Sequence, residues 1–188
     1  MNYDQFVFSA LHFLADRTVL LDWSVVFFAR YLPYLLALGA LVALVRVSLW
    51  RARIHLAARV ALGAILARGV LTEVIRFFYD RPRPYEALSF EPLLTNGSGS
   101  FPSGHMALLF AIGTALFFYN RAWGAWFLAL SVLTGLARVA AGVHWPSDIA
   151  GGAMIGIVAA LLVQWLLVPS TRFEGAAPEN KSAVAKVS

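Results

Sequence analysis

The sequence predicts an all-α membrane protein, a polytopic helical bundle of about five transmembrane helices with a short N-terminal interfacial helix. Two observations support this fold class. Of the 188 residues, 60% are hydrophobic and 13% are charged, and the mean hydropathy is +0.72. Water-soluble domains contain roughly 45–50% apolar and about 25% charged residues. The apolar residues also form stretches of about 20, which suffice for a helix to cross a hydrocarbon core about 30 Å thick.

Each predicted element is placed by its hydropathy and by the polar residues at its ends. Residues 3–14 are amphipathic and too few for a span, which favours a helix at the membrane interface. The predicted spans cover about residues 23–45, 56–78, 103–119, 122–140 and 147–168, and the third is short. Residues 1–168 thus form one membrane-embedded domain, and the polar residues 169–188 are predicted to be a disordered cytoplasmic tail.

Composition limits the kinds of site and partner. The sequence has no Cys, which excludes disulfides, thiolate zinc sites and cysteine nucleophiles. The net charge of +5 is attributed to arginines that flank membrane spans, not to nucleic-acid binding. We therefore expect membrane lipids and no nucleic acid as partners.

The basic residues are concentrated at one end of the predicted bundle. Residues 46–59 join the first two spans and contain four arginines and no acidic residue. The long loop between the second and third spans carries Asp80, Glu86 and Glu91. Because cytoplasmic loops are enriched in Lys and Arg, we expect the tail in the cytoplasm and the long loop and N-terminus outside.

A first polar cluster ends the second predicted span. Arg76 lies in an otherwise apolar run, where an arginine costs roughly 2.5–3.5 kcal/mol at membrane depth and less near the interface. Pro82 and Pro84 stop the helix, so Arg76 and Arg83 can converge on one anion. Arginines that simply reach from a helix end to the interface would give the same pattern.

A second cluster, Pro102-Ser103-Gly104-His105, precedes the third span. Pro and Ser are typical of a helix start, whose free amide groups form an anion site. The Ser103 hydroxyl would add a donor, and His105 a group that titrates near neutral pH. A Ser-capped helix start with an interfacial histidine is the alternative. Residues 96–100 are interpreted as a connector, with a lid as the alternative.

A third cluster joins the fourth and fifth spans and contains Arg138, His144 and Asp148. His144 and Asp148 are four positions apart, so the carboxylate can hold one ring nitrogen and leave the other as a nucleophile. Asp148 also suits the positive N-terminal end of a helix. A capped turn with an ion pair explains these residues equally well.

Topology brings the three clusters to one face, because the second span ends, the third starts, the fourth ends and the fifth starts there. The combination of arginines, a helix N-terminus and two histidines at one face is typical of a phosphate-binding site. Arg68 and Glu73, at membrane depth, are predicted to form an internal ion pair and to have no direct role. Arg30 is a candidate partner of Glu73, although nothing in the sequence shows this pairing.

The three motifs resemble the signature of the type 2 phosphatidic acid phosphatase superfamily of membrane lipid phosphatases. That signature is Lys, six residues, Arg-Pro; then Pro-Ser-Gly-His; then Ser-Arg, five residues, His, three residues, Asp. Here residues 76–84 match the first part with Arg in place of Lys, residues 102–105 match the second in full, and residues 137–148 match the third with Ala in place of Ser. Arg76 keeps the positive charge and offers a bidentate fork, whereas Ala137 lacks a hydroxyl that could orient a neighbour.

The resemblance implies a mechanism. His144 would attack phosphorus and form a phosphohistidine, Asp148 would fix its tautomer, and His105 would protonate the leaving oxygen and then activate water. The implied phosphate-binding groups are Arg76, Arg83, Ser103, Gly104 and Arg138. No metal and no cofactor is expected, since arginines neutralise the phosphate charge.

Within this superfamily the chain is most similar to the bacterial undecaprenyl-diphosphatases of the inner membrane, which serve peptidoglycan synthesis and are linked to bacitracin resistance. The implied substrate is a lipid (di)phosphate, most simply undecaprenyl diphosphate, and the site would face the exterior. Phosphatidylglycerophosphate, phosphatidic acid and lipid A phosphates stay open as substrates, as does phosphotransfer to another lipid. A lipid scaffold or transporter is the non-enzymatic alternative, although transport would favour polar groups at mid-membrane.

Overall fold

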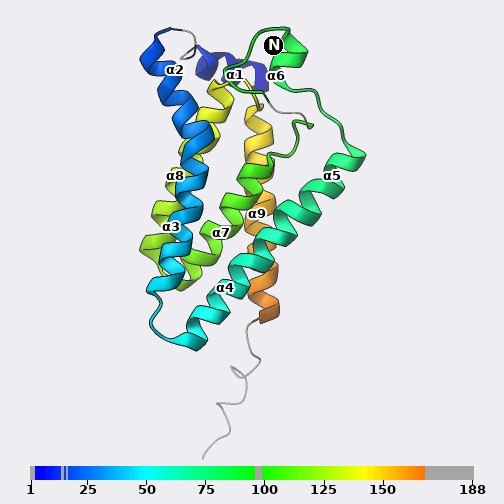
Figure 1. Ribbon diagram of the computed structural model, residues 1–188. Helices are drawn as coiled ribbons and strands as arrows, with labels where there is room; N and C mark the ends of the chain where they lie inside the picture. Colours follow the sequence, from blue (N-terminus) through cyan, green and yellow to red (C-terminus); the bar gives the residue numbers. More distant parts are fainter. Residues whose placement is uncertain (1–2, 14, 16, 96–98, 168–188) are drawn as a thin grey trace, which may run out of the picture.

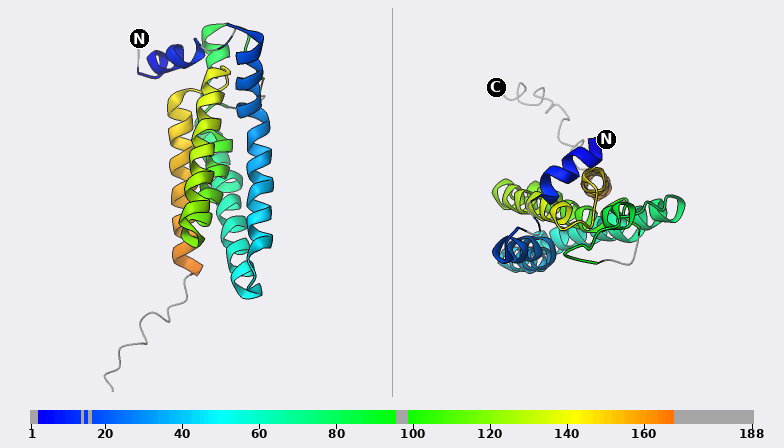
Figure 2. Two further views of the ribbon diagram at one scale, coloured as in Figure 1. Left: turned by 90° about the vertical axis from the view of Figure 1, so that its left-hand side faces the viewer. Right: turned by 90° about the horizontal axis from the view of Figure 1, so that it is seen from above.

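The computed structural model describes residues 3–13, 15, 17–95 and 99–167, and throughout these ranges it contains helices and no strand. The long helices lie side by side as a bundle, and α1 (Tyr3–His12) lies across one end (Figure 1; Figure 2). The predicted all-α class is therefore confirmed. The predicted tail, residues 169–188, and residues 96–98 of the predicted connector lie outside the described residues.

The first span is one continuous helix, Val19–Arg46, and the second is Trp50–Phe78. The first consists of α2 (Val19–Val26), a π-helical segment (Phe27–Tyr31) and α3 (Leu32–Arg46), and the second of α4 (Trp50–Ala64), a π-helical segment (Ile65–Leu71) and α5 (Thr72–Phe78). The second helix begins six residues before its predicted start at Leu56. Its first turns are rich in arginine, so hydropathy alone placed the start too late.

The remaining long helices are α7 (Gly104–Tyr119), α8 (Arg121–Ala140) and α9 (Pro146–Leu167). Four of the described helices are long and apolar enough to cross a membrane, and α7, with 16 residues, is shorter, as predicted. A five-residue helix, α6 (Pro84–Leu88), lies in the long loop. These boundaries lie within a few residues of the predicted ones.

Glycines let α9 approach α7 closely. A Cβ atom at Gly152 would lie 2.4 Å from the Ser103 carbonyl oxygen, and one at Gly156 would lie 2.5 Å from the Ala107 carbonyl oxygen. Small residues at such contacts allow the backbones of membrane helices to pack directly. The contact also fixes the N-terminus of α7 beside the first turn of α9, so the second and third motifs meet.

Helix α1 is attached to the same end of the bundle. Phe8, which is 2% exposed, packs with its ring centroid 5.3 Å from that of Trp145. The Nδ1 atom of His12 lies 2.8 Å from the carbonyl oxygen of Ala140, at the end of α8. Figure 1 shows α1, α6 and the start of α9 at this end, and the turn between α3 and α4 at the other.

Candidate active site

A polar cavity of about 120 Å³ opens where the three motifs meet. Its lining residues come from five segments of the chain and are Arg68, Arg76, Arg83, Gly104, His105, Arg138 and His144. Six of the eight residues predicted from the sequence line this cavity, while Asp148 lies behind His144 and Ser103 lies beside Gly104. The structure thus brings the predicted groups together around one polar space.

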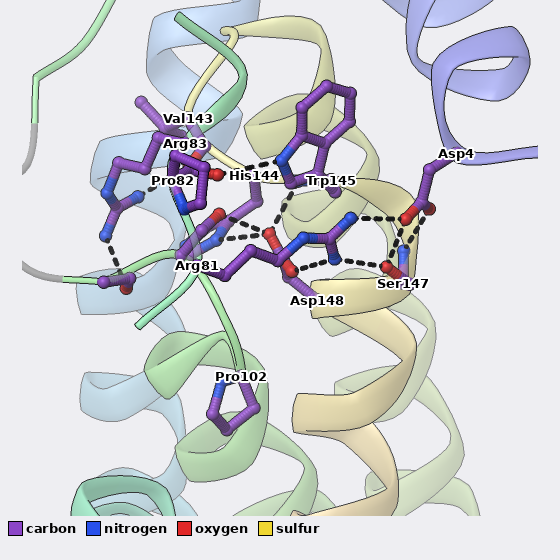
Figure 3. A network of polar contacts seen from close by, with 12 residues as sticks. Asp4, Arg81, Pro82, Arg83, Pro102, Val143, His144, Trp145, Ser147 and Asp148 are labelled. Atoms are coloured by element: carbon purple, nitrogen blue, oxygen red, sulfur yellow. Dashed lines mark hydrogen bonds and ion pairs between the residues drawn. The ribbon is translucent and has the colours of Figure 1, made fainter. Parts of the chain in front are cut away.

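Arg83 connects the first motif to the third. Its side chain is buried, and its Nη1 atom donates to the carbonyl oxygen of Val143 at 2.6 Å, while Nη2 donates to the carbonyl oxygen of Gly99 at 3.3 Å (Figure 3). Burial lowers the pKa of Arg83, yet a guanidinium keeps its charge at any ordinary pH. The long loop is therefore tied to the turn that carries His144.

Arg76 and Arg138 are oriented in the same way. Arg76 Nη2 donates to the carbonyl oxygen of Pro102 at 2.9 Å, which connects the first motif to the second. Arg138 is buried, and its Nη1 atom donates to the carbonyl oxygen of Ala29 at 3.0 Å. These two bonds go to neutral carbonyl oxygens, and they orient the guanidinium groups.

The two departures from the family signature fit the structure. Arg76 reaches the cavity and supplies the positive charge there. Ala137 is buried in an apolar cluster with Val25 and Ala29, where a small apolar side chain is well accommodated.

Arg68 also lines the cavity, although only an ion pair and no direct role were predicted for it from the sequence. Its predicted ion pair with Glu73 is confirmed, and Glu73 also lies 3.7 Å from Arg76 Nη1. The guanidinium stem crosses over Gly104, where a Cβ atom would lie 2.5 Å from Arg68 Nε. Glycine at this position therefore makes room for a fourth arginine at the cavity. Among the described residues Arg30 has no ion-pair partner, so its pairing with Glu73 does not occur.

His144 and Asp148 are both buried, and His144 Nδ1 lies 3.4 Å from Asp148 Oδ2. This distance is within ion-pair range but longer than an ordinary hydrogen bond. Burial lowers the pKa of His144 to about 4, with Arg138 and Arg83 adding to the effect and Asp148 opposing it. The ring is therefore neutral at pH 7, and Nε2 is the ring nitrogen directed away from the carboxylate.

Asp148 is held by donors from three segments. Oδ2 accepts from the backbone N–H of Trp145 at 2.7 Å and from the hydroxyl of Ser100 at 2.5 Å. Oδ1 accepts from Arg81 Nη1 at 2.8 Å (Figure 3). These three donors fix the orientation of the carboxylate beside His144. The carboxylate can therefore orient the histidine and stabilise a positive charge on its ring.

Arg81 and Asp4 extend this network to α1, and neither contact was predicted from the sequence. Arg81 Nη2 donates to Asp4 Oδ2 at 2.7 Å. Asp4 also accepts from the backbone N–H of Ser147 at 2.9 Å and from its hydroxyl at 2.5 Å. Burial raises the pKa of Asp4, but the bonds from Arg81 and Ser147 outweigh it and lower the pKa overall. The N-terminal helix is thus bonded to the first turn of α9.

Ser103 occupies the position before the first residue of α7, but its hydroxyl does not cap the helix. The hydroxyl is buried and has no hydrogen-bond partner among the described residues, whereas its backbone N–H donates to the carbonyl oxygen of Asp148 at 3.0 Å. The alternative of a Ser-capped helix start is therefore wrong. His105 follows in the first turn and faces the cavity.

Within the described ranges no three His, Asp or Glu side chains are grouped as metal ligands.

Known proteins are similar to this chain in both sequence and fold. The sequence pattern of the PAP2 superfamily matches residues 57–172. Undecaprenyl-diphosphatase BcrC of Bacillus subtilis is 31% identical over 168 residues, which cover 86% of this chain and 82% of that protein. The bacitracin transport permease protein BcrC of Bacillus licheniformis is 31% identical over 170 residues, covering 88% and 80%. The crystal structure of Aquifex aeolicus LpxE aligns with a TM-score of 0.71 and 28% identity, covering 88% of this chain and 96% of LpxE.

Proposed function

Because the chain belongs to the PAP2 superfamily of membrane lipid phosphatases, we propose that it removes the terminal phosphate of undecaprenyl diphosphate through a phosphohistidine intermediate. The observation that carries this proposal is the cavity in which four arginines meet His105 and His144, with Asp148 behind His144. The 31% sequence identity to an undecaprenyl-diphosphatase, over most of both chains, supports undecaprenyl diphosphate as the substrate.

The distal phosphate of the substrate occupies the arginine-lined cavity. The Arg68, Arg76, Arg83 and Arg138 side chains compensate its charge, and the first free amide groups of α7 point toward an anion at that helix end. The Ser103 hydroxyl, which has no partner among the described residues, is available as a further donor. Because these donors are already oriented, they stabilise the transition-state charge without rearrangement.

The first chemical step transfers the phosphoryl group to His144. The Nε2 lone pair attacks the distal phosphorus, and the bond from phosphorus to the bridging oxygen breaks. Protonated His105 gives its proton to that oxygen, so undecaprenyl phosphate leaves and His105 becomes neutral. The His144 ring gains positive charge, which Asp148 stabilises.

The second step returns the enzyme to its starting state. Neutral His105 takes a proton from a water molecule, whose oxygen attacks phosphorus as the bond to His144 Nε2 breaks. Inorganic phosphate leaves, His144 recovers its lone pair, and His105 is again protonated. The four arginines of the cavity compensate the phosphate charge in both steps, so we propose that no metal ion takes part.

The charge distribution supports a site on the extracytoplasmic side of a bacterial inner membrane. The turn between α3 and α4 lies at the end of the bundle opposite α1 (Figure 1), and residues 46–59, which include this turn and the first part of α4, contain four arginines. By the positive-inside rule that end faces the cytoplasm, and the end with the cavity faces the exterior.

A second candidate is the transfer of the same phosphoryl group to another lipid, because His144 and His105 would act identically and only the acceptor would differ. Other lipid phosphates, including phosphatidylglycerophosphate, phosphatidic acid and lipid A, present the same terminal group to the cavity. The permease name of the Bacillus licheniformis relative is the observation that favours a transport role. One assay of lipid phosphate turnover distinguishes these alternatives from hydrolysis of undecaprenyl diphosphate.

The test is phosphate release from undecaprenyl diphosphate by purified protein in detergent with EDTA. We expect rapid release by the wild type and by His55→Ala, which removes an exposed histidine of α4, and release at least a thousandfold slower by His144→Ala. Phosphate release from phosphatidic acid alone would contradict the proposed substrate but agree with the proposed chemistry. Loss of substrate without free phosphate would indicate phosphotransfer, and no reaction would contradict the phosphatase assignment for this lipid.

A further inference from the structure

A second and larger cavity, of about 440 Å³, adjoins the phosphate cavity. Its walls are formed by Arg30 and Tyr34 of the first span, by residues 92–95 of the long loop, and by His105 and Arg138. His105 and Arg138 line both cavities. The two spaces therefore meet at the group that protonates the leaving oxygen in the proposed reaction.

Arg30 is a charged residue within a membrane span, and it lines the second cavity. It lies eleven residues after the first residue of the span Val19–Arg46, or roughly 16 Å along the helix axis, and it is exposed to the cavity. Among the described residues it has no ion-pair or hydrogen-bond partner. An arginine at membrane depth costs roughly 2.5–3.5 kcal/mol on insertion scales, and such residues commonly mark sites for ions or substrates.

The helix changes from α-helical to π-helical geometry around Arg30. Arg30 lies in the π-helical segment Phe27–Tyr31, and the neighbouring carbonyl oxygen, that of Ala29, accepts the bond from Arg138 Nη1 at 3.0 Å. Single π turns within α-helices occur frequently at functional sites. The backbone that carries Arg30 is therefore bonded directly to an arginine of the phosphate cavity.

We propose that Arg30, assisted by the Tyr34 hydroxyl, binds the phosphate that stays on the lipid and so selects lipid diphosphates over lipid monophosphates. This inference rests on the proposed function. His144 must attack from the side opposite the leaving oxygen, and His105 must reach that oxygen. The proximal phosphate then lies beyond His105, and the second cavity is the space on that side.

The charges of the reaction agree with this placement. The proximal phosphate of a diphosphate ester is anionic, and it keeps a negative charge while His105 protonates its bridging oxygen. A phosphomonoester such as phosphatidic acid instead places an uncharged alkoxy group and the rest of the lipid there. Arg30 would thus contribute to binding and to the transition state only when a second phosphate is present. Pro92, Leu93 and Leu94 give the same cavity an apolar wall suited to the lipid chain.

The test compares undecaprenyl diphosphate with dioleoyl phosphatidic acid in the same mixed micelles, using the full chain. We expect Arg30→Met and Arg30→Gln to lower the ratio of the two kcat/KM values by about tenfold or more, as expected for a lost charge-assisted contact. Arg30→Lys should retain part of the preference. Arg46→Met, which removes an exposed arginine at the other end of the same span, should leave the ratio unchanged.

A second readout is inhibition of undecaprenyl diphosphate hydrolysis by undecaprenyl phosphate, the product that carries the retained phosphate. The inhibition constant should rise about tenfold or more in Arg30→Met and stay constant in Arg46→Met. An unchanged ratio and an unchanged inhibition constant in a folded, active Arg30 variant would overturn the proposal. A wild type that does not hydrolyse the diphosphate at all would instead overturn the proposed function, and the diphosphate subsite with it.

Discussion

Arg81 Nη1 donates to Asp148 Oδ1 at 2.8 Å, although the two residues are 67 positions apart in the sequence. The other oxygen of that carboxylate faces His144 Nδ1 at 3.4 Å. Arg81 therefore sets the position of the group that orients the proposed nucleophile, while Asp4 holds Arg81 from the other side at 2.7 Å. A chain of charged contacts thus runs from the N-terminal helix to the histidine.

We expect Arg81→Gln to lower kcat about ten- to a hundredfold with a smaller change in KM, because Asp148 would lose the charged one of the three donors described above while the phosphate cavity stays intact. Asp4→Asn should have the same effect on a smaller scale, and Arg81→Lys should be less severe than Arg81→Gln. Glu91→Gln, an exposed loop change, is the control. Steady-state kinetics would speak against this role if Arg81→Gln changed KM alone.

Gly104→Ala should weaken phosphate binding. The added methyl group would lie 2.5 Å from Arg68 Nε and 2.8 Å from Arg68 Cδ, so the flexible side chain must leave its place at the cavity. We expect kcat/KM to fall roughly tenfold, as for the loss of one charge-assisted contact. Gly39→Ala has nothing within 4 Å of the new methyl group and should keep full activity. Equal activity of the two variants would show that Arg68 does not bind the phosphate.

Gly152→Ala should destabilise the bundle. Its methyl group would lie 2.4 Å from the Ser103 carbonyl oxygen, and backbone at this point cannot move aside without separating α7 from α9. Overpacking of this kind costs about 1–3 kcal/mol, so thermal unfolding in detergent should occur several degrees lower. Gly63→Ala, whose methyl group meets its nearest atom at 3.8 Å, is the matched control. Equal melting temperatures would contradict the close packing of these helices.

Acid should destabilise the fold partly through His144. Its pKa is about 4 in the folded protein and about 6.5 in an unfolded chain, so between these values the unfolded state binds the extra proton. The free energy of unfolding therefore falls as pH decreases from 6.5 toward 4, by at most about 3 kcal/mol from this group. His144→Gln lacks this contribution, and its melting temperature should vary less over that range. Parallel pH profiles for the two proteins would rule out the effect.

Hydropathy was sufficient to predict the bundle, because a membrane span must be a long apolar helix in which the backbone groups pair internally. It misplaced the start of α4 because Arg51 and Arg53 extend the helix beyond its apolar part. The three motifs also predicted which residues surround the cavity, since the helix ends fix them to one face of the bundle.

The residues that sequence analysis missed depend on tertiary contacts or on local helix irregularities. In a regular α-helix positions 68 and 76 lie about 80° apart around the axis, and the π-helical segment Ile65–Leu71 changes that angle. Nothing in the sequence signals such a segment. Arg81 and Asp4 interact over a sequence separation of 77 residues, and no local pattern connects them.

The central claim is that His144 carries the phosphoryl group, and the most direct test is to trap it. Undecaprenyl diphosphate labelled in its distal phosphate would be mixed with wild type, His105→Asn and His144→Ala, and quenched in alkali, which preserves phosphohistidine. We expect label on a peptide containing His144, more of it in His105→Asn because hydrolysis of the intermediate is slowed, and none in His144→Ala. Label on another residue, or phosphate release by His144→Ala at the wild-type rate, would contradict the mechanism.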